Sequence, residues 1–193
     1  MGIPPAYSSN ELPFRVSART APAAKPSEIE CEVMNLFEDF RNPLLRYVLS
    51  FGIPVHDAEE VIQEVFLSLF RHLQLGRSRS NLRGWVFRVA HNLALKQRYA
   101  NQRTSGAMTS DWTIAARQHD PSPNPEEQVS SIQRQHRLLA VLHTLPEDDQ
   151  WCIRLRAEGL RYREIAAVLG ISLGAVSMSL TRSLARLIRA DGR

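Results

Sequence analysis

At 193 residues the chain can form one large domain or two small ones. Its net charge of +4 and pI near 9.5 favour an anionic partner, and nearly all of its positive charge is arginine, because Lys25 and Lys96 are the only lysines. Arginine suits bidentate contacts to phosphate and guanine, although a GC-rich coding sequence produces the same bias. Cys31 and Cys152 stand far apart, without a CxxC pair or a Cys/His cluster, so we expect no metal site, no cofactor and no disulfide framework.

The first 26 residues contain five prolines among Ser, Ala and Arg, and they show no sustained apolar periodicity. This composition predicts a disordered leader over residues 1–26. The segment lacks the basic region and apolar run of a targeting signal, and no stretch of the chain approaches the length of a membrane span. We therefore expect a cytoplasmic protein with no membrane insertion.

A first helix is predicted directly after this leader. Ser27 and Glu30 have the spacing of a capping box, in which each side chain binds a free backbone N–H group of the first turn. Apolar residues then recur at helical spacing at Val33, Leu36, Phe37, Phe40, Leu44, Leu45, Val48 and Leu49. Pro43 interrupts this pattern and predicts a kink or a break.

A second helix is expected to start at Asp57, which can cap it and which opens an acidic first turn suited to the helix dipole. Its apolar stripe comprises Ala58, Val61, Ile62, Val65, Phe66, Leu69, Phe70 and Leu73. Its polar face comprises Glu59, Glu60, Gln63, Glu64 and Ser68. By pattern alone, this acidic face is either an ordinary solvated surface or a site for a basic partner.

A third helix follows a short basic loop, with Ser80 or Asn81 as its cap. Its predicted core stripe comprises Leu82, Trp85, Val86, Val89, Ala90, Leu93 and Ala94. Its predicted exposed side comprises Arg83, Phe87, Arg88, His91, Asn92, Leu95, Lys96 and Arg98. No Asp or Glu occurs from Val65 to Ser110, so this basic, aromatic surface suggests nucleic-acid binding beside the acidic helix. The three helices predict a compact domain over residues 27–100.

Helical periodicity disappears between Asn101 and Gln128, where three prolines occur with Ser, Asn and Gly, and this predicts a linker over 101–128. It resumes in a second domain over residues 129–190, where Leu145, Pro146 and Glu147 open a helix. No stretch alternates as a strand would. The predicted fold is all-α, with two small helical domains joined by a flexible linker.

The C-terminal pattern from Tyr162 to Thr181 has helix-turn-helix spacing. Ile165, Ala166 and Leu169 point inward on a short helix, Gly170 makes the turn, and Ser172 caps a second helix. On this helix Val176, Leu180, Leu184 and Leu187 are expected to be buried. Five outward residues near its start are expected to face a DNA major groove, namely Ala175, Ser177, Met178, Thr181 and Arg182.

At this point the sequence resembles the sigma factors of bacterial RNA polymerase, and specifically their extracytoplasmic-function group. Residues 145–147 and 158–176 resemble the promoter-reading C-terminal domain of that family. Residues 57–70 resemble its core-polymerase-binding helix, and residues 81–99 resemble its segment for melting and reading the minus-ten element. The resemblance covers roughly residues 36–188.

The family implies roles for particular residues. It assigns docking on the coiled coil of the largest polymerase subunit to Asp57, Glu60, Gln63, Glu64 and Phe66. It assigns strand separation and capture of an unstacked base to the next helix, where the candidates are Arg83, Trp85, Arg88, Asn92, Lys96 and Arg98. Trp85 lies on the inner stripe, so its position favours a core role, whereas Asn92 can present both a donor and an acceptor to a base.

Minus-thirty-five reading is assigned to the helix-turn-helix, through Arg161, Arg163, Ser172, Ala175, Ser177, Met178, Thr181 and Arg182. The chain departs from the family there. Arg161 replaces the usual Ser or Thr cap, so a cap is lost and a phosphate contact is gained, and Ser177 and Ser179 replace basic residues. We expect weak or unusual minus-thirty-five reading, with Met178 on thymine methyl groups and Arg182 on guanine or phosphate.

The leading hypothesis is a sigma factor that binds core RNA polymerase and promoter DNA, both double-stranded and melted. The family alone implies an anti-sigma factor partner. A second hypothesis is a stand-alone helix-turn-helix regulator of duplex DNA, which would need no single-strand surface. A third, an enzyme with a small-molecule substrate, is disfavoured because the six histidines have no ligand spacing and no nucleophile motif or phosphate loop occurs.

Overall fold

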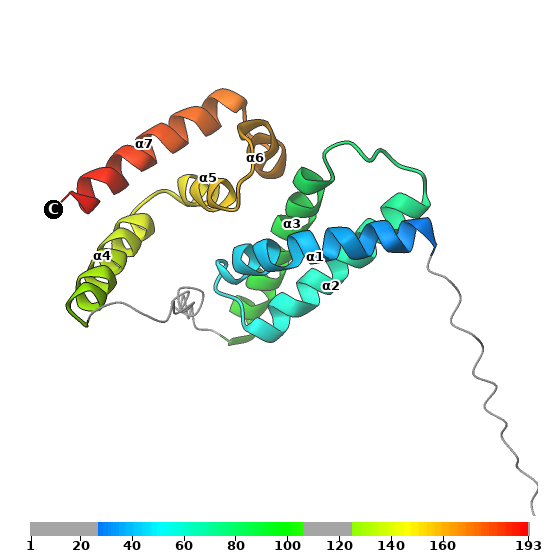
Figure 1. Ribbon diagram of the computed structural model, residues 1–193, viewed down its shortest axis with the longest axis horizontal. Helices are drawn as coiled ribbons and strands as arrows, with labels where there is room; N and C mark the ends of the chain where they lie inside the picture. The colour runs from blue at the N-terminus through cyan, green and yellow to red at the C-terminus, as the bar shows by residue number, and fades with distance from the viewer. Residues whose placement is uncertain (1–26, 106–124, 193) are drawn as a thin grey trace, which may run out of the picture.

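The structure is a computed structural model that describes residues 27–105 and 125–192 (Figure 1). The predicted leader over residues 1–26 and the middle of the predicted linker lie outside the described residues. Within the described ranges the chain forms seven helices and no strand, which confirms the all-α prediction. We refer to α1 to α3 as the N-terminal unit and to α4 to α7 as the C-terminal unit.

The first helix, α1 (Glu28–Leu49), begins with the predicted capping box. The Ser27 hydroxyl accepts a hydrogen bond from the backbone N–H of Glu30 at 3.2 Å, and the Glu30 carboxylate accepts one from the Ser27 N–H at 2.6 Å. Pro43 lies inside the helix without ending it, so the alternative of a break there is wrong. One lost backbone hydrogen bond is offset because this half of α1 packs in the core through Leu44, Tyr47 and Val48.

The second helix, α2 (Val55–Gln74), begins two residues earlier than predicted. Pro54 occupies the N-cap position, where its extended backbone suits a helix start, and no side chain caps the first turn. Asp57 therefore lies within the first turn and does not cap the helix. The predicted inner stripe is buried except at Phe70, which is half-buried.

The third helix, α3 (Leu82–Ser105), extends further than predicted. Asn81 caps its start, because its side-chain oxygen accepts a hydrogen bond from the Gly84 N–H at 3.2 Å. Asn81 also adopts a left-handed backbone with φ of +56°, which asparagine tolerates better than most residues. The helix continues through Asn101 into the segment predicted as linker.

The C-terminal unit comprises α4 (Pro125–His143), α5 (Glu147–Ala157), α6 (Tyr162–Leu169) and α7 (Leu173–Asp191). The last two helices form the predicted helix-turn-helix, with a 107° bend between them. Gly170 makes the turn with φ of +69°, and the Ser172 hydroxyl caps α7 by accepting a hydrogen bond from the Ala175 N–H at 3.1 Å. Leu184 was expected to be buried, yet it is exposed, while Ser179 and Ser183 are buried on this helix.

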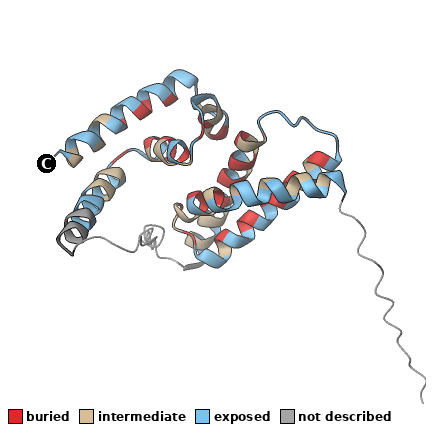
Figure 2. Cartoon of the chain, viewed as in Figure 1, coloured by how far each residue is buried: buried red, intermediate tan, exposed pale blue. Residues whose placement is uncertain are grey.

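The two units pack directly against each other through an aromatic cluster, which Figure 2 locates among the buried segments where α3, α5 and α1 meet. The Trp151 ring of α5 stacks on the Phe51 ring at a centroid distance of 4.0 Å, and it meets the Tyr47 and His91 rings edge-on at 6.1 and 5.6 Å. All four side chains are buried, so a single hydrophobic core extends across both units.

No single helix within the described ranges is long and apolar enough to cross a membrane, although α6 and α7 pass the test of length and composition when taken together as a bent pair.

Candidate functional site

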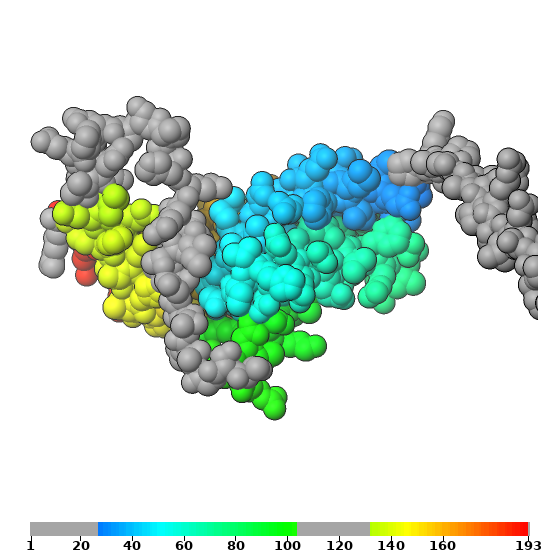
Figure 3. All heavy atoms as spheres, turned by 90° about the horizontal axis from the view of Figure 1, so that it is seen from below, coloured from blue at the N-terminus to red at the C-terminus, as the bar shows by residue number. Residues whose placement is uncertain are grey.

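The polar face of α2 presents an acidic surface to solvent. Glu60, Gln63 and Glu64 are exposed, as predicted, and the α1–α2 face is seen in Figure 3. Glu60 lies 3.2 Å from the Nε2 atom of His56, and Glu64 lies 3.9 Å from Arg71. Exposed pairs of this kind contribute little to stability, so both carboxylates can exchange these contacts for a basic partner.

Two residues predicted for this docking face are held inside the N-terminal unit. Phe66 is 6 % exposed, and its ring packs edge-on against the Phe37 ring at 4.8 Å. The Asp57 carboxylate accepts hydrogen bonds from the side-chain amides of Gln97 at 3.2 Å and Asn101 at 2.6 Å, and these bonds tie α2 to α3. The prediction that Phe66 contacts a partner is therefore wrong, and Asp57 acts chiefly as a link between two helices.

One apolar residue that sequence reasoning missed lies on the acidic face. Leu67 is 51 % exposed, and its position three residues after Glu64 and four after Gln63 places it on the same side of α2. An exposed leucine bordered by charged residues is typical of the centre of a protein interface. Its missing place in the inner stripe was the available signal.

Three of the six minus-ten candidates form an exposed stripe along α3. Arg88, Asn92 and Lys96 are spaced four residues apart and are all exposed, as predicted. Asn92 and Lys96 line a shallow hollow of about 520 Å³ together with Tyr99 and Arg103. Tyr99 is 59 % exposed, so it can offer its ring to a base, and neither it nor Arg103 was among the assigned candidates.

The other three minus-ten candidates have partners within the chain. Arg83 donates a hydrogen bond from Nη2 to the backbone carbonyl of Glu158, and Arg98 forms an ion pair with Glu147 at 2.6 Å. Trp85 is half-buried with its ring 4.6 Å from the ring of His72, which supports the core role that its stripe position favours. These three side chains are not presented to solvent as the exposed stripe is.

Phe87 and His91 were predicted on the exposed side of α3, and this prediction is wrong. Phe87 is fully buried and His91 is 7 % exposed, because the C-terminal unit covers this side of the helix. The His91 Nδ1 atom shares a hydrogen bond of 2.8 Å with the hydroxyl of Tyr47. Burial lowers the pKa of His91 to about 4, so its ring is neutral near pH 7.

The start of α7 presents the predicted recognition surface. Ala175, Ser177, Met178 and Thr181 are all exposed, and Met178 is 70 % exposed, so its thioether can reach a thymine methyl group. Ser179 is only 5 % exposed, so a basic residue there could not reach DNA without disrupting the core. The chain therefore lacks one outward cation at this surface, at Ser177, and not two.

Arg182 is held by a carboxylate of its own unit. Its guanidinium donates to both carboxylate oxygens of Asp149, with shortest distances of 2.8 Å, and Asp149 is buried. DNA would have to compete with this bidentate pair for Arg182, which weakens the prediction of a guanine or phosphate contact.

The start of α6 lacks a side-chain cap, as the Arg161 substitution predicts. The Glu164 carboxylate accepts a hydrogen bond from the Arg161 backbone N–H at 2.6 Å, which satisfies one free donor and leaves the Arg161 side chain exposed. Arg163 is also exposed. Both can therefore reach a phosphate group.

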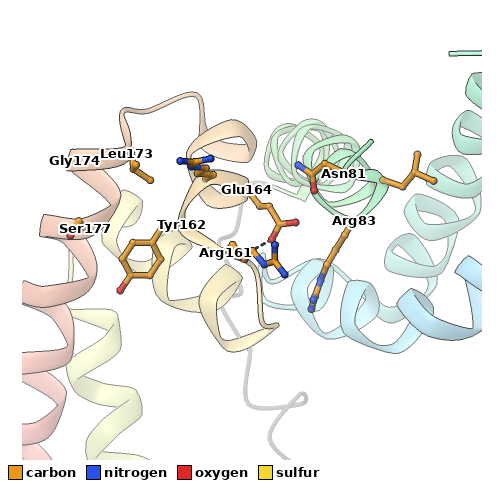
Figure 4. A pocket seen from close by; sticks show the side chains of 10 residues that line it. Asn81, Arg83, Arg161, Tyr162, Glu164, Leu173, Gly174 and Ser177 are labelled. Carbon is orange, nitrogen blue, oxygen red and sulfur yellow. Dashed lines mark hydrogen bonds between the residues drawn. The ribbon is translucent and has the colours of Figure 1, made fainter. Parts of the chain in front are cut away.

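A cleft of about 1140 Å³ separates the start of α3 from the helix-turn-helix (Figure 4). One wall carries Asn81, Leu82 and Arg83, and the opposite wall carries Arg161, Tyr162, Arg163, Glu164, Leu173, Gly174 and Ser177. The cleft thus brings a minus-ten candidate face to face with minus-thirty-five candidates.

Comparison with known families matches the two units separately. Residues 36–104 match sigma-70 region 2, and residues 135–187 match sigma-70 region 4. The matched ranges coincide with the units that carry the exposed stripe of α3 and the helix-turn-helix.

Several curated proteins are similar over both ranges. The chain is 30 % identical over 143 residues to the ECF RNA polymerase sigma-E factor of Escherichia coli, covering 70 % of this chain and 74 % of that protein. It is 33 % identical to the ECF RNA polymerase sigma factor SigE of Mycolicibacterium smegmatis, covering 68 % of this chain and 51 % of that protein. A Xanthomonas campestris protein named "Probable RNA polymerase sigma factor RfaY" is 29 % identical over 75 % of this chain, which spans only 36 % of that protein.

Two solved structures share the fold. One is CnrH in complex with the cytosolic domain of CnrY, with a TM-score of 0.54, 23 % identity and coverage of 81 % of this chain and 85 % of that chain. The other is RpoE in complex with the anti-sigma factor NepR from Bartonella quintana, with a TM-score of 0.57, 19 % identity and coverage of 81 % and 96 %. At these identities the likeness establishes the helical arrangement alone.

Proposed function

The chain belongs to the extracytoplasmic-function group of sigma-70 family RNA polymerase sigma factors, and from this premise we propose that it binds core RNA polymerase and directs initiation at specific promoters. The observation that carries the proposal is the pair of exposed surfaces on consecutive helices: the acidic face of α2 and the stripe of Arg88, Asn92 and Lys96 on α3. A stand-alone regulator of duplex DNA has no need for either surface.

Core polymerase docks on the acidic face of α2. Glu60, Gln63 and Glu64 supply charge and hydrogen bonds for a basic, helical partner surface such as the coiled coil of the largest subunit, and Leu67 supplies apolar contact at the centre. Asp57 supports this face by fixing α2 on α3. The contribution of Phe66 is indirect, because its buried ring holds α1 against α2.

Melted minus-ten DNA binds along the exposed stripe of α3. Asn92 reads an unstacked base through its amide, while Arg88, Lys96 and Arg103 neutralise backbone phosphates and Tyr99 stacks on a base. The helix-turn-helix reads the minus-thirty-five duplex through the start of α7, with Met178 providing apolar readout and Arg161 and Arg163 binding phosphate.

The first test is binding of the full chain to purified core polymerase. We expect the double reversal Glu60→Lys/Glu64→Lys to weaken binding at least tenfold, because it replaces attraction by like-charge repulsion. The matched control is Glu38→Lys/Asp39→Lys, which changes the same charge at two exposed positions of α1. Equal binding by the two double variants would remove the docking role of the α2 face.

The second test is promoter opening by the reconstituted holoenzyme on a library of promoters. Asn92→Ala is expected to form holoenzyme normally and to lose open complexes, whereas Asn35→Ala, an exposed asparagine of α1, is expected to retain them. Binding of the chain to duplex operators with no affinity for polymerase would favour the stand-alone regulator instead.

An anti-sigma factor is proposed as a further partner, with support from the structural neighbour solved with NepR. Such a partner would act by covering the α2 face or the DNA-binding surfaces. Co-purification of the full chain with a product of its own cellular context, released in competition with core polymerase, is the measurement that tests this.

A further inference from the structure

The contact between the two units uses charged residues that surround Glu158 at the C-terminal end of α5. The Glu158 carboxylate accepts two hydrogen bonds from the Arg46 guanidinium, at 3.2 Å from Nε and 2.7 Å from Nη2. Its backbone carbonyl accepts a hydrogen bond from Arg83 of α3. The negative end of the α5 dipole favours both arginines, so one residue of the C-terminal unit holds two helices of the N-terminal unit.

The same contact occupies residues that the proposed function requires. Arg83 and Arg98 are minus-ten candidates, and both are bound to α5, through the carbonyl of Glu158 and the carboxylate of Glu147. Neither arginine can hold a phosphate while it holds its α5 partner, because each donor group serves one acceptor geometry at a time.

The helix-turn-helix is also obstructed. The cleft between α3 and the helix-turn-helix, about 1140 Å³, corresponds to a space roughly 10 Å across, which is narrower than the ~12 Å major groove of a duplex. Leu173, Gly174 and Ser177 at the start of α7 line this cleft opposite Asn81 and Arg83 (Figure 4). A duplex that receives the start of α7 would therefore collide with the start of α3.

We propose that the packing of the C-terminal unit on the N-terminal unit is an autoinhibited form of the free protein, and that the units must separate before promoter DNA can bind. The inference rests on the proposed function in assigning the occluded residues to DNA, while the closed contact itself stands on the geometry alone. Binding energy from core polymerase or DNA then shifts the protein from the closed to the open form.

The test uses the Arg46–Glu158 pair, because neither residue belongs to the proposed polymerase or DNA surfaces. Arg46→Glu places two carboxylates together and should open the contact, and Glu158→Arg should do the same. The double variant Arg46→Glu/Glu158→Arg restores an ion pair with reversed polarity and should close it again. Arg41→Glu, at an exposed position of the same helix, has the same charge change and is the control.

The separation of the units can be measured without polymerase or DNA. Spin labels at the exposed Cys31 of α1 and at Ala140→Cys of α4 report the distance between units, while the buried Cys152 stays unlabelled. We expect one short distance in the parent protein, the double variant and Arg41→Glu, and a longer, broader distribution in each Arg46 or Glu158 single variant. A parent protein that is already open, or single variants that stay closed, would overturn the inference.

Binding of the polymerase-free chain to a fluorescent duplex pool of randomised sequence supplies the functional arm. Arg46→Glu makes the protein less basic, so charge alone predicts weaker DNA binding. Release of the occluded surfaces predicts the opposite, a gain of about five- to tenfold, since apparent affinity scales with the open fraction. Units that separate with no gain in DNA affinity over Arg41→Glu would overturn autoinhibition, whereas failure to bind core polymerase would remove only the proposed function.

Discussion

At the scale of single residues, Gly159 shows how closely the two units approach. Its backbone has φ of +83°, and a Cβ atom at this position would lie 2.9 Å from the Nη2 atom of Arg83. Glycine is therefore needed twice, for the backbone and for the passage of the arginine.

We expect Gly159→Ala to lower the free energy of unfolding by about 2 kcal/mol, measured by urea denaturation. Gly170→Ala is the matched control, because Gly170 has φ of +69° with no atom within 4 Å of an added Cβ. It should lose only the backbone contribution of about 1 kcal/mol. Equal losses would show that Arg83 makes no close contact there.

His91 predicts a dependence of stability on pH. Its folded pKa of about 4 lies below the ordinary value of 6.5, because burial disfavours the charged ring. The unfolded chain therefore binds the proton more tightly. The stability from the neutral ring is fully present above pH 6.5 and is lost as the pH falls toward 4, by up to roughly 3 kcal/mol.

Urea unfolding at several pH values checks this, with His91→Gln as the variant that keeps a hydrogen-bonding side chain but cannot titrate. Its stability should fall less steeply between pH 6.5 and 4 than that of the parent protein. An NMR titration that places the His91 imidazole near pH 6.5 would contradict the burial effect.

The misplaced residues in the sequence analysis share one physical cause. The helical period correctly separates two faces of α3, but it cannot show that Phe87 and His91 face a second unit whose residues lie more than 40 positions away. Glu60, Asn92 and Met178 were placed correctly because nothing in the described chain covers their faces. Local periodicity predicts which residues share a face, and only tertiary packing decides whether that face is covered.

At the scale of elements, α5 and α7 are joined by Arg182 and Asp149. The carboxylate of Asp149 is 3 % exposed and receives both of its charged hydrogen bonds from Arg182. We expect Arg182→Ala to cost about 2–3 kcal/mol of stability, because it leaves a buried carboxylate unpaired. Thermal unfolding without DNA measures this, and the exposed neighbour Thr181→Ala serves as control. Unchanged stability with reduced DNA binding would restore Arg182 to the recognition surface.

The recognition helix offers a second prediction, on the dependence of DNA binding on salt. Ser177→Arg adds an outward cation at the start of α7, so the slope of log K against log salt should become steeper by about 0.9. Ala140→Arg, on the exposed side of α4, should leave the slope unchanged. Ser179→Arg should instead destabilise the unit, because Ser179 is buried. An unchanged slope for Ser177→Arg would mean that this part of α7 does not approach phosphate.

Sequence signals located the helices well and their ends less well. The capping box of Ser27 and the turn at Gly170 were predictable because side-chain and glycine chemistry fixes them locally. The expected break at Pro43 was wrong, since packing of the surrounding helix outweighs one lost hydrogen bond. Likewise, Asp57 has the chemistry of a cap, but its carboxylate instead binds amides of α3.

At the scale of the whole molecule, the aromatic cluster couples the stability of the two units. We expect thermal unfolding followed by far-UV circular dichroism and by tryptophan emission to coincide in the parent protein. Phe51→Ala removes the ring stacked on Trp151 and should cost about 3 kcal/mol, so that the two transitions separate. Phe37→Ala, which removes a ring contact inside the N-terminal unit, should lower stability without separating them. Separate transitions in the parent protein would contradict a shared core.

The order of the units and their all-α class were predictable from the sequence, because each unit has its own periodic pattern and its own family resemblance. Their packing was not, since the contact combines an ion pair between Arg46 and Glu158 with a stack between Phe51 and Trp151, and no local pattern connects these positions.

The position of Trp151 has a consequence for exchanging parts between related proteins. Trp151 belongs to the C-terminal unit by chain order, yet its ring completes the core formed by Tyr47, Phe51 and His91 of the N-terminal unit. A chimera cut between the units would transplant one side of this cluster without the other. It would keep both DNA-reading surfaces and lose the mutual fit that holds them together, so modules that are separable in the gene are interdependent in the core.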